Sequence, residues 1–192
     1  MKRTEHNILR VYDQATADEL RQGLEWYSNA HAQAALLHAD IRVGAAIIAA
    51  LSPGLRWEKN VEAARRVIAG ESLEGLGVRW PDGVAKAKRI LAGENPAVVL
   101  KGNKVRAFWQ CILNPDNVLH VCIDGHAYSI WRGKRIPVNA TPEIADRAYV
   151  KISSDYVQAA RAVGITPARL QAITWIVWRR LHGADKPGRK AA

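Results

Sequence analysis

Two short segments combine residue types that could do chemistry. The first, Leu100–Phe108 (LKGNKVRAF), has the pattern of a helix that ends in a tight glycine turn, followed by a new helix that begins beside a lysine. The second, residues 121–127 (VCIDGHA), places Asp124 after a short apolar run, where a helix begins. An aspartate at that position accepts hydrogen bonds from the exposed N–H groups of the helix. It also faces any cleft at the helix end. A plain helix cap is the simpler of these two interpretations.

Helices must position these residues, because most of the chain has helical periodicity. Residues 41–51 include few polar positions and are expected to form a central buried helix. Thr16 and Glu19 have the spacing of a capping box, and Thr141-Pro142 has the pattern of a helix start. These features predict an all-α, single domain over residues 1–183 and a basic, disordered tail at 184–192. The expected helices are 15–39, 41–51, 56–69, 81–91, 96–100, 105–113, 124–131, 149–163 and 167–182.

Composition removes several classes of protein. Hydrophobic residues make up 48% of the 192 residues, which excludes wholesale disorder. No apolar run suits a membrane span and the N-terminus does not resemble a secretory signal, so a cytoplasmic protein of bacterial or phage origin is expected. Cys111 and Cys122 are too few for a disulfide framework or a four-thiolate cluster. His120, Cys122, Asp124 and His126 alternate, but the Asp-Gly step interrupts the strand that a metal site with this spacing needs. No metal or cofactor is therefore expected.

The formal net charge is +10, from 28 lysines and arginines against 18 acidic residues. This surplus favours a polyanionic partner, because neutralised phosphates release counterions. A basic globular protein without a polyanionic partner can have the same composition, and the net charge does not distinguish the two. Trp57, Trp80 and Trp131 fall near expected turns, where aromatic side chains beside cations suit base stacking. Trp109, Trp175 and Trp178 are expected to lie in the core.

The two segments together resemble the helix-hairpin-helix superfamily of DNA glycosylases, of which endonuclease III is a familiar member. The Gly102 turn takes the place of the family's hairpin, and Ile123-Asp124-Gly125-His126 that of its aspartate motif. Lys104 and Asp124 are separated by 124 − 104 = 20 residues, which is close to the family's spacing. The resemblance covers about residues 38–135 and implies a glycosylase-like helical bundle on which the N- and C-terminal helices pack. Within the superfamily, the chain is similar to a divergent, phage-type member that lacks the iron–sulfur cluster.

The resemblance implies a DNA base-processing enzyme, most simply an N-glycosylase that acts on a flipped base. Lys104 takes the position of the amine that attacks the sugar C1′ and forms a Schiff base, with Lys101 as the less favoured substitute. Asp124 takes the position of the catalytic aspartate, and His126 that of a supporting, more often structural, residue. The residues expected to contact DNA are Gly102, Asn103, Arg56, Trp57, Arg106, Arg132 and Lys134.

Three departures from the family pattern keep other functions open. The turn has one glycine, Gly102, in place of the two whose N–H groups bind a phosphate. Gly54 stands where endonuclease III has a glutamine that fills the gap left by the flipped base. The four cysteines that bind the iron–sulfur cluster in endonuclease III are missing. A catalytically inactive DNA-binding protein on the same scaffold, or a phage enzyme that modifies a base without excising it, fits these departures. A monomer is expected.

Overall fold

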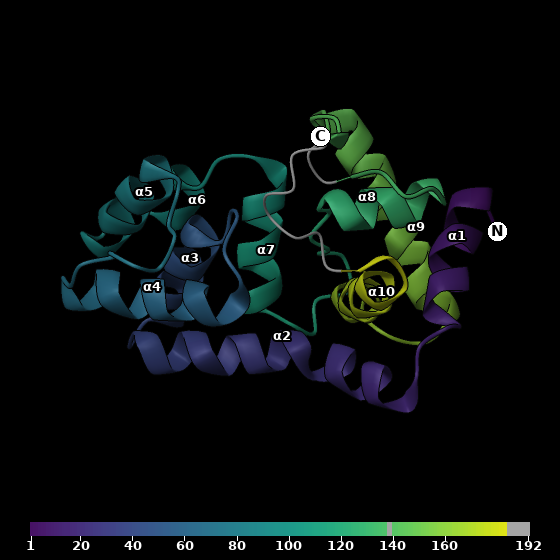
Figure 1. Ribbon diagram of the computed structural model, residues 1–192, viewed down its shortest axis with the longest axis horizontal. Helices are drawn as coiled ribbons and strands as arrows, with labels where there is room; N and C mark the ends of the chain where they lie inside the picture. The colour runs from purple at the N-terminus through teal and green to yellow at the C-terminus, as the bar shows by residue number, and fades with distance from the viewer. Residues whose placement is uncertain (138–139, 184–192) are drawn as a thin grey trace. The chain divides into compact units, whose positions relative to one another are not determined.

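The computed structural model describes residues 1–137 and 140–183, and within these ranges it has ten α-helices and no strand (Figure 1). The predicted all-α class is confirmed. The predicted tail at 184–192 lies outside the described residues. In chain order the helices are α1 (Arg3–Tyr12), α2 (Ala17–Leu37), α3 (Ile41–Leu51), α4 (Trp57–Ala69), α5 (Pro81–Leu91), α6 (Pro96–Val99), α7 (Asn103–Leu113), α8 (Gly125–Arg132), α9 (Asp146–Ala162) and α10 (Pro167–His182).

The helices are distributed over two compact units. The terminal unit combines Met1–Trp26 with Asp116–Ala192, and the central unit is Tyr27–Pro115. One boundary falls inside α2 and the other follows α7. The glycosylase-like core expected from the sequence, residues 38–135, therefore extends over parts of both units.

Helix α3 forms the core of the central unit, as its apolar sequence predicts. Residues 44–51 are all buried, and α3 contacts α4, α5, α6 and α7. A Cβ on Gly83 of α5 would lie 2.6 Å from the Ala50 carbonyl oxygen, so α5 approaches α3 at a distance that only glycine permits. Buried Asn60 of α4 donates a hydrogen bond of 3.1 Å to the Ile48 carbonyl. That carbonyl is in the last turn of α3, where the helix itself offers no partner.

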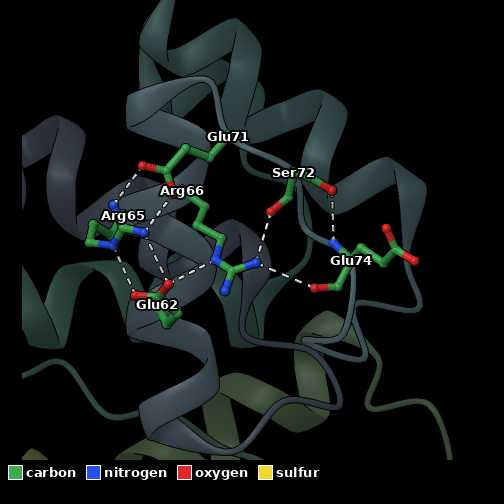
Figure 2. A network of polar contacts seen from close by, with 6 residues as sticks. All are labelled: Glu62, Arg65, Arg66, Glu71, Ser72 and Glu74. Carbon is green, nitrogen blue, oxygen red and sulfur yellow. Dashed lines mark hydrogen bonds and ion pairs between the residues drawn. The ribbon is translucent and has the colours of Figure 1, made fainter.

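A network of charged side chains connects residues 71–74, the segment after α4, to α4 itself (Figure 2). The Glu62 carboxylate accepts hydrogen bonds from Arg65 at 2.9 Å and from Arg66 at 2.8 Å. Arg65 also pairs with Glu71 at 2.6 Å. Arg66 donates to the backbone carbonyls of Ser72 and Glu74 at 3.0 and 3.3 Å. The two arginines thus hold an irregular stretch of backbone in place.

The terminal unit is built from α1, the first part of α2, α8, α9 and α10, and α1 contacts α8, α9 and α10. Asp155 of α9 is fully buried and accepts three hydrogen bonds. They come from Lys2 Nζ at 2.6 Å, Thr4 Oγ1 at 2.8 Å and Trp131 Nε1 at 2.9 Å. Burial alone would raise the pKa of Asp155, but these donors outweigh it and the pKa lies below its ordinary value. One carboxylate therefore ties α1 and α8 to α9.

Most predicted helix boundaries agree with the structure, but one predicted start is wrong. The capping box of α2 is present, with Thr16 N–H donating to Glu19 at 2.9 Å and Glu19 N–H to Thr16 Oγ1 at 3.3 Å. No helix begins at Thr141-Pro142; α9 begins at Asp146 instead. The Thr141 hydroxyl donates back to the Pro137 carbonyl at 3.3 Å, so it is used in a local turn rather than as a helix cap.

Among the described residues, no single helix is both long and apolar enough to cross a membrane. Helices α2 and α3, joined at a bend of 111°, meet the requirement of length and composition only as a pair. In the central unit, α3 is a buried core helix.

Candidate functional site

The glycine turn predicted from the sequence is present in the central unit. Helix α6 ends at Val99, and Gly102 then adopts φ 78° and ψ 137° directly before α7. A Cβ at Gly102 would meet no atom within 4 Å, so the need for glycine is conformational rather than steric. Lys104 is the second residue of α7 and its side chain is exposed, as is that of Lys101. The turn thus presents two lysines at the beginning of a helix.

The exposed Arg106 of α7 links the turn to the end of α6. Its guanidinium donates to the Leu100 carbonyl and to the Ala97 carbonyl, each at 2.8 Å. These carbonyls lie at the end of α6, where no helical partner exists. Arg106, which the resemblance assigns to DNA contact, therefore also has a structural role in fixing the turn.

In the terminal unit, backbone contacts with Tyr149 set the position of Asp124. The buried residues 121–123 form no strand, and the Tyr149 hydroxyl takes the place of a neighbouring strand. It accepts from the Ile123 N–H at 3.0 Å and donates to the Val121 carbonyl at 3.1 Å. The next residue, Asp124, is the N-cap of α8, and its Oδ1 accepts from the Ala127 N–H at 2.8 Å. The carboxylate is half-buried, and one oxygen is used by the helix cap.

The surroundings of Asp124 combine a buried phenol with an aromatic and cationic group. Tyr156 is fully buried and donates to the Ala127 carbonyl at 3.2 Å. Burial raises the pKa of Tyr156, and the negative charge of Asp124 raises it further, so the phenol stays neutral. His126 meets the Trp175 ring edge-on at 6.4 Å between centroids, and the Arg179 guanidinium lies 4.3 Å from the centre of the same ring. His126 is thus packed against α10.

The remaining predicted contact residues are exposed or half-buried and are distributed over both units. Arg56 is exposed before α4, and Trp57 and Asn103 are half-buried at the starts of α4 and α7. Arg132 and Lys134 are exposed on either side of Gly133, the left-handed C-cap of α8. The residues of the glycine turn therefore belong to the central unit, and Asp124, His126, Arg132 and Lys134 belong to the terminal unit. Asp124 precedes α8, whereas Arg132 and Lys134 are at the opposite end of that helix.

Two contacts of the terminal unit, one at the site and one in the core, had no signal in the sequence. Tyr149 could not be linked to residues 121–123, because nothing local connects a tyrosine to a segment 26 residues earlier. Asp155 and its partner Lys2 are 153 residues apart. Both contacts depend on tertiary packing, which periodicity does not reveal.

No group of histidine, cysteine and acidic side chains within the described ranges has the arrangement of a metal site. No curated protein and no solved structure gives a significant match to the chain. A family model described as a family of unknown function, DUF7178, matches residues 1–182. The match includes both the glycine turn and the capping aspartate. The chain belongs to this family of unknown function.

Proposed function

We propose that the chain is a DNA base-processing enzyme, most simply an N-glycosylase, with Lys104 and Asp124 as its reactive residues. The observation that carries the proposal is the turn at Gly102, which presents an exposed lysine at the second position of α7. The half-buried, capping Asp124 supports it. Exposed Lys101, Arg56, Arg132 and Lys134 suit an anionic ligand.

In the proposed reaction, the neutral ε-amine of Lys104 attacks C1′ of a flipped nucleotide. The C1′–N bond breaks, and the base leaves with the electron pair and takes up a proton. The lysine nitrogen, cationic after the attack, loses one proton and leaves an aminal at C1′. The C1′–O4′ bond then breaks and O4′ takes up a proton, which gives a protonated imine between the lysine and C1′. Asp124 is the base that accepts a proton from the amine, or the negative charge that stabilises the developing oxocarbenium.

Asp124 is suited to this role because its helix cap uses one oxygen. Oδ1 accepts the Ala127 N–H, and the side chain is half-buried rather than enclosed. The helix cap fixes the orientation of the carboxylate, and the Tyr149 contacts fix the backbone that carries it. Substituting asparagine at position 124 would keep the cap and remove the charge. The substitution thus separates the chemical role from the structural one.

Borohydride trapping tests the lysine. The protein is incubated with duplexes that carry different modified bases and an abasic site, and sodium borohydride reduces any imine to a stable amine. Wild type and Lys59→Gln, an exposed lysine of α4, should form a covalent adduct, and Lys104→Gln should not. An adduct that is lost only in Lys101→Gln would move the nucleophile to Lys101.

Two other results would point to different functions. Release of a base without an adduct would indicate a glycosylase that relies on Asp124 and water. Tight DNA binding with neither base release nor an adduct on any duplex would contradict the enzymatic proposal and leave a DNA-binding protein.

A further inference from the structure

Trp80 is the only aromatic side chain that is exposed within the described residues, all other Phe, Tyr and Trp side chains being half-buried or buried. Its exposed fraction is 58%, compared with 8% for Trp109 and for Trp178. Exposure of an indole to water is unfavourable in free energy, because its large apolar surface is not removed from the solvent. A single exposed apolar side chain is ordinary by itself, so the case for a contact surface at Trp80 depends on the groups that lie beside it.

The indole of Trp80 has a fixed neighbour in the central unit. Trp80 is the N-cap of α5, and its Nε1 lies 3.5 Å from the point that a Cβ on Gly54 would occupy. The ring therefore lies against the turn that ends α3, where Gly54 has φ 76°. A ring held on one side and exposed on the other loses little conformational entropy when a ligand stacks on it.

An open hollow of about 590 Å³ lies between the segment after α4 and the beginning of α5, and its lining includes Arg79 and Pro81, the chain neighbours of Trp80, but not Trp80 itself. Its apolar wall includes Leu73, Val78, Pro81 and Val84. The side chains of Arg79 and Lys88 also contribute to its lining. An apolar hollow that contains two cations is suited to a ligand that is flat and apolar in one part and anionic in another.

The charges of this surface are available to a ligand. No hydrogen bond or ion pair with another described residue involves the side chains of Arg79, Lys88 or Arg56. Two other cations of α5 already have carboxylate partners: Lys86 pairs with Asp82 at 2.5 Å, and Arg89 pairs with Glu94 at 2.6 Å. Cations without a carboxylate partner contribute most to the free energy of binding a nucleic acid, because each phosphate that they neutralise releases its counterions.

We propose that Trp80, Arg79 and Lys88 form a stacking site for an unpaired base of single-stranded DNA, with the cations at the adjoining phosphates. An unpaired base offers the flat π-face that an indole can stack against, whereas a paired base within a duplex does not. The site rests on the proposed function only in taking DNA as its ligand. It requires neither Lys104 nor Asp124, and it defines a second contact surface on the central unit.

Binding of a fluorescein-labelled oligo(dT), followed by fluorescence anisotropy at low salt, tests the proposal. Trp80→Ala should weaken binding about 5- to 140-fold, which is the range for loss of one stacked base. Trp80→Phe should retain most of the affinity. Val150→Ala, which changes an exposed apolar side chain of α9, should bind as wild type does. Lys88→Ala should reduce the slope of log Kd against log salt by about 0.7.

An oligomer of the same length made of abasic nucleotides separates stacking from charge. Wild type should bind it more weakly than oligo(dT), and Trp80→Ala should bind it as wild type does. Equal binding of oligo(dT) by wild type and Trp80→Ala, or no binding by wild type, would overturn the proposal. Failure of the proposed enzymatic function has a different signature: loss of trapping and base release while the Trp80-dependent binding of oligo(dT) persists.

Discussion

Replacing Asp155 with alanine should strongly destabilise the terminal unit. The fully buried carboxylate accepts from Trp131 Nε1 at 2.9 Å and from Thr4 Oγ1 at 2.8 Å. A hydrogen bond to a charged acceptor contributes about 1.5–3 kcal/mol, so these two bonds together predict a loss of about 3–6 kcal/mol. The ion pair with Lys2 adds little to this figure, because the Lys2 side chain is 60% exposed and water screens it. Lys2→Ala should therefore be much milder than Asp155→Ala.

Urea unfolding monitored by far-UV circular dichroism measures these losses, and hydrogen exchange of α1 and α9 assigns them to the terminal unit. Asp18→Ala is the matched control, because Asp18 is an aspartate with a 73% exposed side chain. The low pKa of Asp155 adds a second expectation: its contribution is present above the ordinary carboxyl pKa and is lost as the pH falls through the lower, folded-state value. Equal losses for Lys2→Ala and Asp155→Ala, or no loss for Asp155→Ala, would refute this reasoning.

Further predictions concern the central unit. Gly83→Ala should lower the free energy of unfolding by about 1–3 kcal/mol through overpacking, because the alanine Cβ would lie 2.6 Å from a backbone oxygen of α3. This loss should exceed the gain from the higher helix propensity of alanine. A variant that is more stable in urea unfolding would contradict the close approach of the two helices. Gly102→Ala, with free space but φ 78° and ψ 137°, should cost about 1–3 kcal/mol from backbone strain alone, and an unchanged midpoint would contradict this. Hydrogen bonds from Arg65 and Arg66 lower the pKa of Glu62 from 4.5 to about 2. Its stabilising contribution is thus complete above pH 4.5 and is lost as the pH falls toward 2. Glu62→Gln should remove that part of the acid dependence in thermal unfolding, and an unaltered pH profile would count against the network.

The parts of the fold that local sequence specifies could be predicted. The buried helix α3 follows from its apolar composition, and the caps at Thr16 and Asp124 follow from side chains that bond their own helix. Thr141 has the same local signature, but its hydroxyl bonds back to Pro137, and the helix begins later. Helix α1 had no signature, because its N-cap is Lys2 and the Glu5 carboxylate accepts the Lys2 N–H at 2.9 Å.

The division into two units could not be predicted, because one boundary lies inside the continuous helix α2. Lys104 and Asp124 were linked in the sequence only by their spacing and by a family resemblance. The structure places Lys104 in the central unit and Asp124 in the terminal unit. The local geometry of each residue follows from its own helix start.

Base release under single-turnover conditions tests the central claim most directly. Duplexes that carry one modified base each are incubated with excess protein, and the free base is quantified. Asp124→Asn is compared with Asp40→Asn, since both aspartates are N-caps that accept a backbone N–H and asparagine preserves the cap. We expect wild type and Asp40→Asn to release a base at the same rate, and Asp124→Asn to be slower by about 100-fold or more. Release of no base from any duplex, or an Asp124→Asn rate equal to that of wild type, would contradict the account.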